Sequence, residues 1–269
     1  MLETAIQRLR KNIRGDVRVS YLDRMPYSND ESIFTLLPSV VVAPKSEEDV
    51  RVCLEVAKTH DLPITCRGGG TGVAGQSIGS GMILDFRTHF DAILGIASDS
   101  VRVQPGVILS DLNQKLALQG RRFAPDPGSM RRCTIGGMIA TNASGPRGFL
   151  HGSTRGHVRD LSVMLSDGIV EKSSRMPQRF ESLTKAVRER SEDIASHWPR
   201  VRKNSSGFHL PSLVGQAKPD YTGFLVGSEG TLGIVLEAEL RTVPLPSEVT
   251  VLVLGFDEYE NALRELPEW

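Results

Sequence analysis

Arg67-Gly68-Gly69-Gly70-Thr71-Gly72-Val73-Ala74-Gly75-Gln76 is the stretch of sequence that decides the fold. It places five glycines within residues 68–75, directly after the apolar run 62–66. Because glycine loses much conformational entropy on folding, such a cluster is typical of positions that need positive φ or that let the backbone approach a ligand. Successive N–H groups in such a turn form an anion-binding nest, and Arg67 adds a positive charge beside it. The stretch therefore predicts a site for a phosphate or pyrophosphate group.

Residues 70–75 also match G-x-G-x-x-G, the dinucleotide fingerprint of Rossmann folds. That fingerprint requires a helix that opens at the glycines. Residues 76–81 are too rich in glycine and serine for a helix, and a strand is predicted over residues 82–86. The strand–loop–strand context argues against a Rossmann fold and leaves a plain glycine-rich hairpin as the alternative.

Two further clusters of small residues follow. The rigid turn at residues 125–129 precedes residues 134–145, in which Thr134 can cap a short helix with two glycines in its first turn. The free N–H groups of such a helix start would be a second anion site. The third cluster spans residues 227–235. Three such loops suit a long, flat ligand that is held along its length.

Together these motifs resemble the FAD-binding domain of the vanillyl-alcohol oxidase/p-cresol methylhydroxylase flavoproteins, and more narrowly the branch of D-lactate, glycolate and D-2-hydroxyglutarate dehydrogenases. Residues 203–208, Lys-Asn-Ser-Ser-Gly-Phe, resemble the K-N-x-x-G-[YF] segment of that branch. The resemblance runs from about residue 27 to residue 246. It implies an α+β fold: a two-lobed FAD-binding domain of the p-cresol methylhydroxylase type, with mixed sheets flanked by helices.

The expected domain division is an N-terminal helical segment (1–35), a first FAD-binding lobe (36–105), a second lobe (106–246) and the start of an incomplete cap, or substrate, domain (247–269). One helical face, made by Leu2, Ile6, Leu9 and Ile13, predicts a helix that packs on the domain, in preference to a basic helix on an anionic membrane. A strand is expected over 249–256 and a helix over 257–266. Because the cap begins here in the resembling family, the chain is expected to be an N-terminal fragment of a longer enzyme, or a gene product without its cap.

The resemblance implies non-covalent FAD. Residues 67–76 would wrap the pyrophosphate, 125–129 and 134–137 would hold the pyrophosphate and ribityl groups, and 140–145 would run beside the isoalloxazine. Thr71 stands where many covalently flavinylated relatives place a histidine, so no 8α-histidyl bond is expected. The predicted cofactor-binding residues are Arg67, Gly68, Gly69, Gly70, Thr71, Gly72, Gly75, Gln76, Pro125, Asp126, Pro127, Ser129, Thr134, Gly136, Gly137, Ala140, Thr141, Ser144, Gly145, Glu229, Gly230, Ile234 and Val235.

The resemblance implies the FAD-binding part of a flavin-dependent oxidoreductase that oxidises a 2-hydroxy acid, such as D-lactate, glycolate or D-2-hydroxyglutarate, by hydride transfer to flavin N5. In that family the base and the metal-binding histidines lie in the cap or beyond. The six histidines show no metal-ligand spacing, so neither a metal site nor a catalytic residue is predicted. Of these, His151, His157 and His209 could approach the cofactor or the substrate side, although a structural role is favoured for each.

Two alternatives stay open: a FAD-holding subunit or inactive remnant without its own catalysis, and a flavoenzyme with other chemistry, such as enolpyruvate reduction or alditol oxidation. The implied partners are a 2-hydroxy acid, an iron–sulfur or quinone electron acceptor, and the missing cap domain or a partner subunit. The balance of 32 basic and 32 acidic residues argues against a nucleic-acid partner.

No apolar run approaches the roughly 20 residues that span a bilayer. The three cysteines, Cys53, Cys66 and Cys133, lie far apart in the sequence and imply no disulfide framework. The expected location is cytoplasmic, with at most a peripheral contact at the inner face of a membrane.

Overall fold

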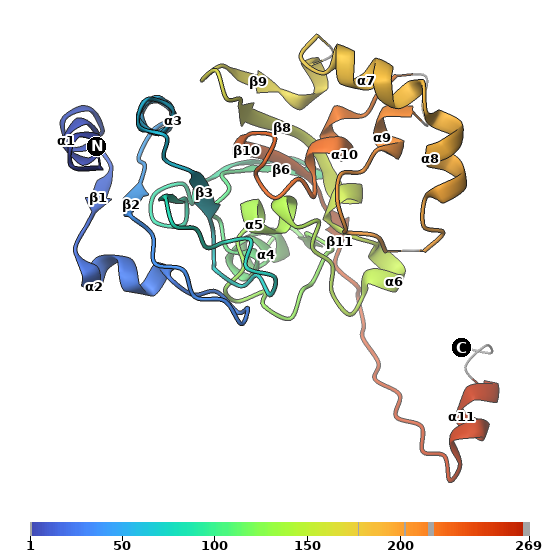
Figure 1. Cartoon of the computed structure of the whole chain (residues 1–269). Helices are drawn as coiled ribbons and strands as arrows, with labels where there is room; N and C mark the ends of the chain where they lie inside the picture. The colour runs from blue at the N-terminus through green and yellow to red at the C-terminus, as the bar shows by residue number, and fades with distance from the viewer. Residues whose placement is uncertain (1, 177, 202, 215–217, 266–269) are drawn as a thin grey trace.

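The computed structural model describes residues 2–176, 178–201, 203–214 and 218–265 (Figure 1). Its strands form a four-stranded sheet, a five-stranded sheet and a two-stranded ribbon. Helices flank both larger sheets, which agrees with the expected α+β class.

The four-stranded sheet has the order β1-β2-β4-β3 and carries the first glycine cluster at one edge. Strand β1 (Asp16–Arg18) pairs antiparallel with β2 (Val40–Ala43), whereas β2, β4 (Met82–Asp85) and β3 (Ile64–Arg67) run parallel. The glycine-rich segment therefore connects two parallel neighbours, β3 and β4. The hairpin alternative is wrong, because a hairpin would make these strands antiparallel.

Two helices cover this sheet. Helix α3 (Glu47–His60) begins at Ser46, whose hydroxyl accepts a hydrogen bond from the N–H of Asp49 at 3.1 Å. Helix α1 (Leu2–Asn12) buries Ile6 and Leu9 in the same core cluster as Cys53 of α3. The prediction that the N-terminal helix packs on the domain is confirmed.

The five-stranded sheet is antiparallel throughout and has the order β5-β6-β10-β8-β9. Its members are β5 (Ile93–Ile96), β6 (Ser100–Val103), β8 (Val158–Met164), β9 (Val170–Lys172) and the central β10 (Ile234–Arg241). Helices α4 (Leu109–Ala117), α5 (Ile135–Ala140) and α10 (Tyr221–Leu225) contribute side chains to its core. The change of sheet thus falls between β4 and β5, within the span 36–105 that is expected to be the first lobe.

The remaining elements are short or peripheral. They are α2 (Tyr21–Arg24), the 3-10 helix η1 (Met25–Tyr27), β7 (Arg121–Arg122), which pairs with β11 (Val243–Pro244), α6 (Gly148–His151), η2 (Thr154–His157), η3 (Ser173–Arg175), α7 (Glu181–Arg188), α8 (Ser191–His197), α9 (Pro211–Val214) and α11 (Tyr259–Glu265).

The strand expected over residues 249–256 is wrong. These residues form no strand and extend away from the body, ahead of α11 (Figure 1). Val251 and Val253 are 82% and 86% exposed, so the apolar side chains meet no neighbouring strand. Apolar, β-branched residues favour a strand only where an adjacent strand can pair with them. The helix expected over 257–266 is confirmed as α11.

Candidate functional site

The three glycine-rich segments, far apart in the sequence, converge on one cleft. Two adjoining cavities form it, and they share Cys66, Gly68, Thr134, Gly137, Ala140 and Gly230. The lining contains the following predicted residues: Arg67, Gly68, Gly69, Gly70, Thr71, Gly72, Gln76, Thr134, Gly136, Gly137, Ala140, Thr141, Glu229, Gly230, Ile234 and Val235. The lining also contains residues that were not among the predicted cofactor-binding residues: Cys66, Ser77, Phe86, Pro105, Ile139, Leu225, Ser228 and Gly233.

One end of the cleft is a row of unused backbone donors. Within the described part of the chain, the N–H groups of residues 68–72 donate to no protein acceptor. Gly70 has a φ of +65°, which a side-chain-bearing residue adopts only at a cost. Because a concave set of free N–H groups binds anions, this end is suited to a phosphate or pyrophosphate group.

The other end of the cleft is apolar. Phe86 follows β4, Ile139 comes from α5, Leu225 ends α10, and Ile234 begins β10. An apolar pocket of this kind buries a flat ring, because the transfer of ring surface out of water is favourable. The cleft therefore combines a phosphate-binding end with a ring-binding end.

Helix α5 starts differently from the prediction. The hydroxyl of Thr134 caps it by accepting from the N–H of Gly137 at 3.3 Å, as expected. However, the N–H of Ile135 donates to the Val107 carbonyl at 2.9 Å, and that of Gly136 donates to the Pro105 carbonyl at 2.8 Å. The prediction of a second anion site made of free N–H groups is therefore wrong, because carbonyls 105 and 107 and the Thr134 cap already accept from this helix start.

The two glycines of α5 serve different purposes. A Cβ on Gly136 would lie 2.6 Å from Cβ of Pro105, so this glycine allows close packing. A Cβ on Gly137 would meet only the Thr134 hydroxyl, at 3.4 Å, and Gly137 lines both halves of the cleft. The missing side chain of Gly137 therefore leaves space for a ligand.

The third segment is attached to the carbonyl end of α5. The N–H of Gly227 donates to the Ile139 carbonyl and that of Glu229 to the Ala140 carbonyl, each at 2.9 Å. Gly227, Glu229 and Gly230 have φ values of +91°, +53° and +78°. These contacts fold the segment over the cleft, and Glu229 takes part through its backbone while its side chain is exposed.

Arg67 does not present its charge to the cleft in the way the sequence predicted. Its guanidinium is buried and donates to the carbonyls of Ser77 (3.1 Å) and Asn29 (2.7 Å). Burial lowers the pKa of Arg67, and the nearby Asp30, Tyr27 and Asp85 raise it. The side chain thus holds protein backbone, and protein acidic groups balance its charge.

The remaining predicted residues lie outside the cleft lining: Gly75, Pro125, Asp126, Pro127, Ser129, Ser144 and Gly145. Of these, Asp126 and Gly145 pack against each other. A Cβ on Gly145 would lie 2.0 Å from the Asp126 carbonyl oxygen, and the Asp126 carboxylate accepts from the N–H of Arg147 at 3.3 Å. The turn at 125–129 and the segment after α5 are therefore one packed unit.

The three histidines that were considered have protein partners. Nε2 of His151 lies 2.7 Å from Nη2 of Arg122, Nε2 of His157 lies 2.8 Å from the His151 carbonyl, and Nδ1 of His209 lies 2.8 Å from the Ser212 hydroxyl. Burial, together with Arg155, lowers the pKa of His209 to about 4. These contacts support the structural roles that the sequence favoured.

The cleft lining contains three ionisable side chains among the described residues: Cys66, Arg67 and Glu229. Burial raises the pKa of the Cys66 thiol to about 12, so it stays neutral at physiological pH. Arg67 is a donor and Glu229 is exposed. The described lining therefore holds one carboxylate, that of Glu229, and this side chain is exposed.

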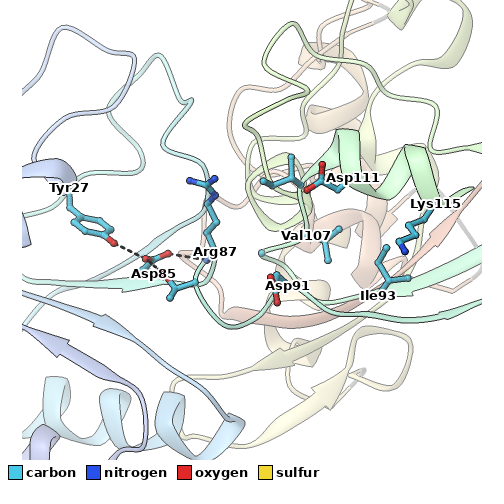
Figure 2. A pocket seen from close by; sticks show the side chains of 11 residues that line it. Tyr27, Asp85, Arg87, Asp91, Ile93, Val107, Asp111 and Lys115 are labelled. Carbon is cyan, nitrogen blue, oxygen red and sulfur yellow. Dashed lines mark hydrogen bonds between the residues drawn. The ribbon is translucent and has the colours of Figure 1, made fainter.

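A separate cavity, of about 640 Å³, is bordered by Tyr27, Asp85 and Arg87 on one side and by Asp111 and Lys115 of α4 on the other (Figure 2). The Tyr27 hydroxyl donates to Oδ2 of Asp85 at 2.7 Å, and the Thr88 hydroxyl donates to the same oxygen at 2.6 Å. Burial and this carboxylate raise the pKa of Tyr27 to about 12. The glycine clusters do not line this cavity, and the mixture of Arg87 and Lys115 with Asp91 and Asp111 favours no single ligand.

Comparison with known families matches residues 38–174 to the FAD binding domain. The chain belongs to this FAD-binding domain family. The match includes the glycine loop after β3 and the start of α5. The free N–H groups at 68–72 fit the FAD pyrophosphate, and the apolar end of the cleft fits one of its rings.

Curated relatives align along most of this FAD-binding domain. D-2-hydroxyglutarate dehydrogenase of Escherichia coli (strain K12) is 33% identical over 275 aligned positions, which cover 94% of this chain and 27% of the relative. D-lactate dehydrogenase of Anaerostipes hadrus is 32% identical, covering 86% of this chain and 42% of the relative. Glycolate oxidase subunit GlcD of Bacillus subtilis (strain 168) is 33% identical, covering 91% and 46%. The chain thus spans between about a quarter and a half of these relatives.

The fold is similar to that of alkyldihydroxyacetonephosphate synthase, with a TM-score of 0.67 at 19% identity. The aligned region covers 91% of this chain and 41% of that chain. At this identity the similarity concerns the fold alone. It confirms the expected architecture of the two-lobed FAD-binding domain. In the described residues, no helix has both the length and the apolar character needed to cross a membrane.

Proposed function

We propose that this FAD-binding domain is the cofactor-holding part of a flavin-dependent oxidoreductase that oxidises a 2-hydroxy acid. The observation that carries the proposal is the alignment of a D-2-hydroxyglutarate dehydrogenase along 94% of the chain at 33% identity. The names D-lactate dehydrogenase and glycolate oxidase subunit belong to the same substrate class. D-2-hydroxyglutarate, D-lactate and glycolate are therefore the first substrates to test.

The chain's own residues would bind and orient the cofactor. The N–H groups of residues 68–72 would hold the pyrophosphate, and the apolar wall around Ile139 and Ile234 would exclude water from a ring. FAD, when bound, supplies the hydride acceptor for oxidation of the substrate α-carbon. Thr71 lines the phosphate-binding end, and its hydroxyl supports no 8α-histidyl bond, so the flavin should be released on denaturation.

The alternative is a FAD-holding subunit or inactive remnant. One observation favours it: the described cleft lining holds no buried base, because its one carboxylate, that of Glu229, is exposed and its Cys66 thiol is neutral. Proton transfer to a positioned base typically contributes about 10²–10⁴-fold to such a reaction. We therefore expect the 269-residue chain alone to oxidise 2-hydroxy acids slowly at most. A cap domain or partner subunit would supply the base, and an iron–sulfur or quinone acceptor would take the electrons.

The test is anaerobic reduction of the FAD-loaded chain. A panel of donors (D-2-hydroxyglutarate, D-lactate, glycolate and an alditol) is mixed with the protein, and loss of the oxidised-flavin absorption is followed, with a dye acceptor in a parallel assay. Reduction by a 2-hydroxy acid in preference to the alditol supports the proposal. Selective reduction by the alditol contradicts it. Bound flavin that no donor reduces, although a chemical reductant does, favours the FAD-holding alternative.

We also propose a cytoplasmic location. The three cysteines are free in the structure, which suits a reducing compartment.

A further inference from the structure

A segment that precedes the family match lies against the back of the glycine loop. Residues 26–34, here called the strap, run from η1 past a short bridge between Asn29 and Thr35, whereas the match begins at residue 38. The glycine loop comprises residues 67–77, between β3 and β4. Its front, at residues 68–72, lines the FAD cleft.

Arg67 joins the strap to the loop. Nη2 donates to the Asn29 carbonyl at 2.7 Å and to the Pro26 carbonyl at 3.4 Å, and Nη1 donates to the Ser77 carbonyl at 3.1 Å. One guanidinium thus connects the two ends of the loop with the strap. A Cβ on Gly70 would lie 2.5 Å from Nη2, so the loop backbone closes directly over this side chain.

Further contacts follow along the strap. The Ser77 hydroxyl donates to the Asp30 carboxylate at 3.0 Å, and the N–H of Glu31 donates to the Gly72 carbonyl at 3.0 Å. The Phe34 ring lies against Gly75, where a Cβ would come within 2.9 Å of Cδ2. The strap therefore contacts the loop at four places along it: Arg67, Gly72, Gly75 and Ser77.

The strap is itself anchored. The Tyr27 ring lies beneath the Arg67 guanidinium, with 5.5 Å between Cζ and the ring centroid, while the Tyr27 hydroxyl donates to Asp85 at the end of β4 (Figure 2). Asp85 is the parallel neighbour of Arg67 in the sheet register. A cation over an aromatic face is stabilising, and the buried carboxylate fixes the ring beneath it.

We propose that the strap, acting through Arg67 and Asp30, positions the glycine loop so that its free N–H groups face the FAD pyrophosphate. Arg67 is a positioning residue in this proposal, because its guanidinium donates to protein carbonyls of the strap and of Ser77. The proposal rests on FAD as the ligand of the cleft. It extends the cofactor site to residues before the family match.

The test compares two substitutions at one position. Arg67→Lys keeps the positive charge but cannot reach three carbonyls in the same geometry, whereas Arg67→Met removes the charge. If Arg67 positions the loop, both variants should bind FAD about tenfold more weakly or worse than the wild type, by fluorescence titration of the 269-residue chain. Exchange of the hydrogen-bonded amides at the loop, here called loop exchange, should also be faster in both FAD-free variants; these amides are Glu31, which donates to the Gly72 carbonyl, and Ala74, which donates to the Gln76 side chain.

Asp30→Ala provides a milder change on the strap, with Asp23→Ala as its matched control. Asp30 binds Ser77 of the loop, whereas Asp23 binds Ser20 within the same N-terminal segment. Asp30→Ala should weaken FAD binding by roughly two- to fivefold and accelerate exchange in the loop, and Asp23→Ala should do neither. If Arg67→Met fails to fold, the comparison of Asp30→Ala with Asp23→Ala still tests whether the strap positions the loop.

Two results would overturn the proposal. One is wild-type FAD affinity in Arg67→Lys with loss in Arg67→Met, which would mean that charge alone matters. The other is identical affinity and loop exchange in Asp30→Ala and Asp23→Ala. Failure of the wild-type chain to bind FAD would instead contradict the cofactor assignment, and the exchange measurements would still test the strap.

Discussion

The two glycine clusters of the cleft look alike in sequence but use glycine differently. In the loop after β3, the N–H groups of residues 68–72 have no acceptor among the described residues. At the start of α5, the N–H groups of Ile135, Gly136 and Gly137 donate to Val107, Pro105 and Thr134. The first cluster therefore offers hydrogen-bond donors to a ligand, whereas the second offers space.

This difference shows how a helix start can line a ligand site without acting as an anion site. Free N–H groups at a helix N-terminus attract anions only while nothing in the protein accepts from them. In α5 the chain at 105–107 supplies two of the acceptors, and the cap residue supplies the third. The two roles can be tested separately, by one substitution that fills the ligand space at α5 and another that disturbs the N–H donors of the loop after β3.

The largest effect is expected for Gly137→Val. The side chain would project into the cleft, because a Cβ there meets only the Thr134 hydroxyl. Valine is a better helix former than glycine, so α5 should persist. We expect FAD binding to weaken about 100-fold or more, roughly 3 kcal/mol, because the branched side chain occupies space that the ligand needs. The measurement is FAD titration with circular dichroism as the check of folding.

Gly95→Val is the control for that experiment. Gly95 lies in β5, and a Cβ there meets nothing within 4 Å. Its FAD affinity should equal that of the wild type. Wild-type affinity in a folded Gly137→Val variant would show that α5 does not border the cofactor.

A smaller effect is expected for Gly70→Ala in the first cluster. Alanine at a φ of +65° costs roughly 1–2 kcal/mol, and its Cβ would displace the Arg67 guanidinium. FAD binding should weaken about tenfold, because the N–H groups of residues 68–72 would no longer be held in position to donate to one phosphate group. Gly120→Ala is a matched control, since Gly120 has a φ of +67° and open space around it. The control should lose stability to chemical denaturation without losing affinity, and equal affinities in both variants would contradict the role of the first cluster.

The sequence was sufficient where local chemistry determines the structure. Thr134 caps α5, and the apolar face of α1 buries Ile6 and Leu9, because short-range patterns determine caps and apolar helix faces. The partners of Arg67 could not be predicted in this way. Its acceptors Pro26 and Asn29 lie 41 and 38 residues away, and backbone carbonyls carry no sequence signal. For the same reason nothing in residues 134–137 reveals that the carbonyls of Pro105 and Val107 accept from α5.

The apolar segment at 249–256 shows where local composition predicts an element that does not form. Its composition favours a strand, but pairing depends on a neighbour that composition does not specify. The sheet to which β6 belongs could not be predicted for a related reason. The apolar pattern of β6 identifies a strand but does not show that the strand pairs with β10, where Val103 lies opposite Ala238, rather than with β4.

The smallest effect is expected at Thr134, which joins the two clusters. Its hydroxyl caps α5 and also lies 2.0 Å from where a Cβ on Gly68 would be. Thr134→Ala should lower the free energy of unfolding by about 1 kcal/mol through loss of the cap, as should Ser46→Ala at α3. FAD affinity should change by less than about threefold in both variants, because neither hydroxyl is needed as a phosphate donor. Denaturant unfolding with and without FAD measures both quantities.

Thr134→Ala frees the N–H of Gly137, so tighter FAD binding in this variant alone would show that the α5 start can bind phosphate once its cap is removed. In that case the Thr134 hydroxyl alone would be what keeps the α5 start from binding an anion as the loop after β3 does.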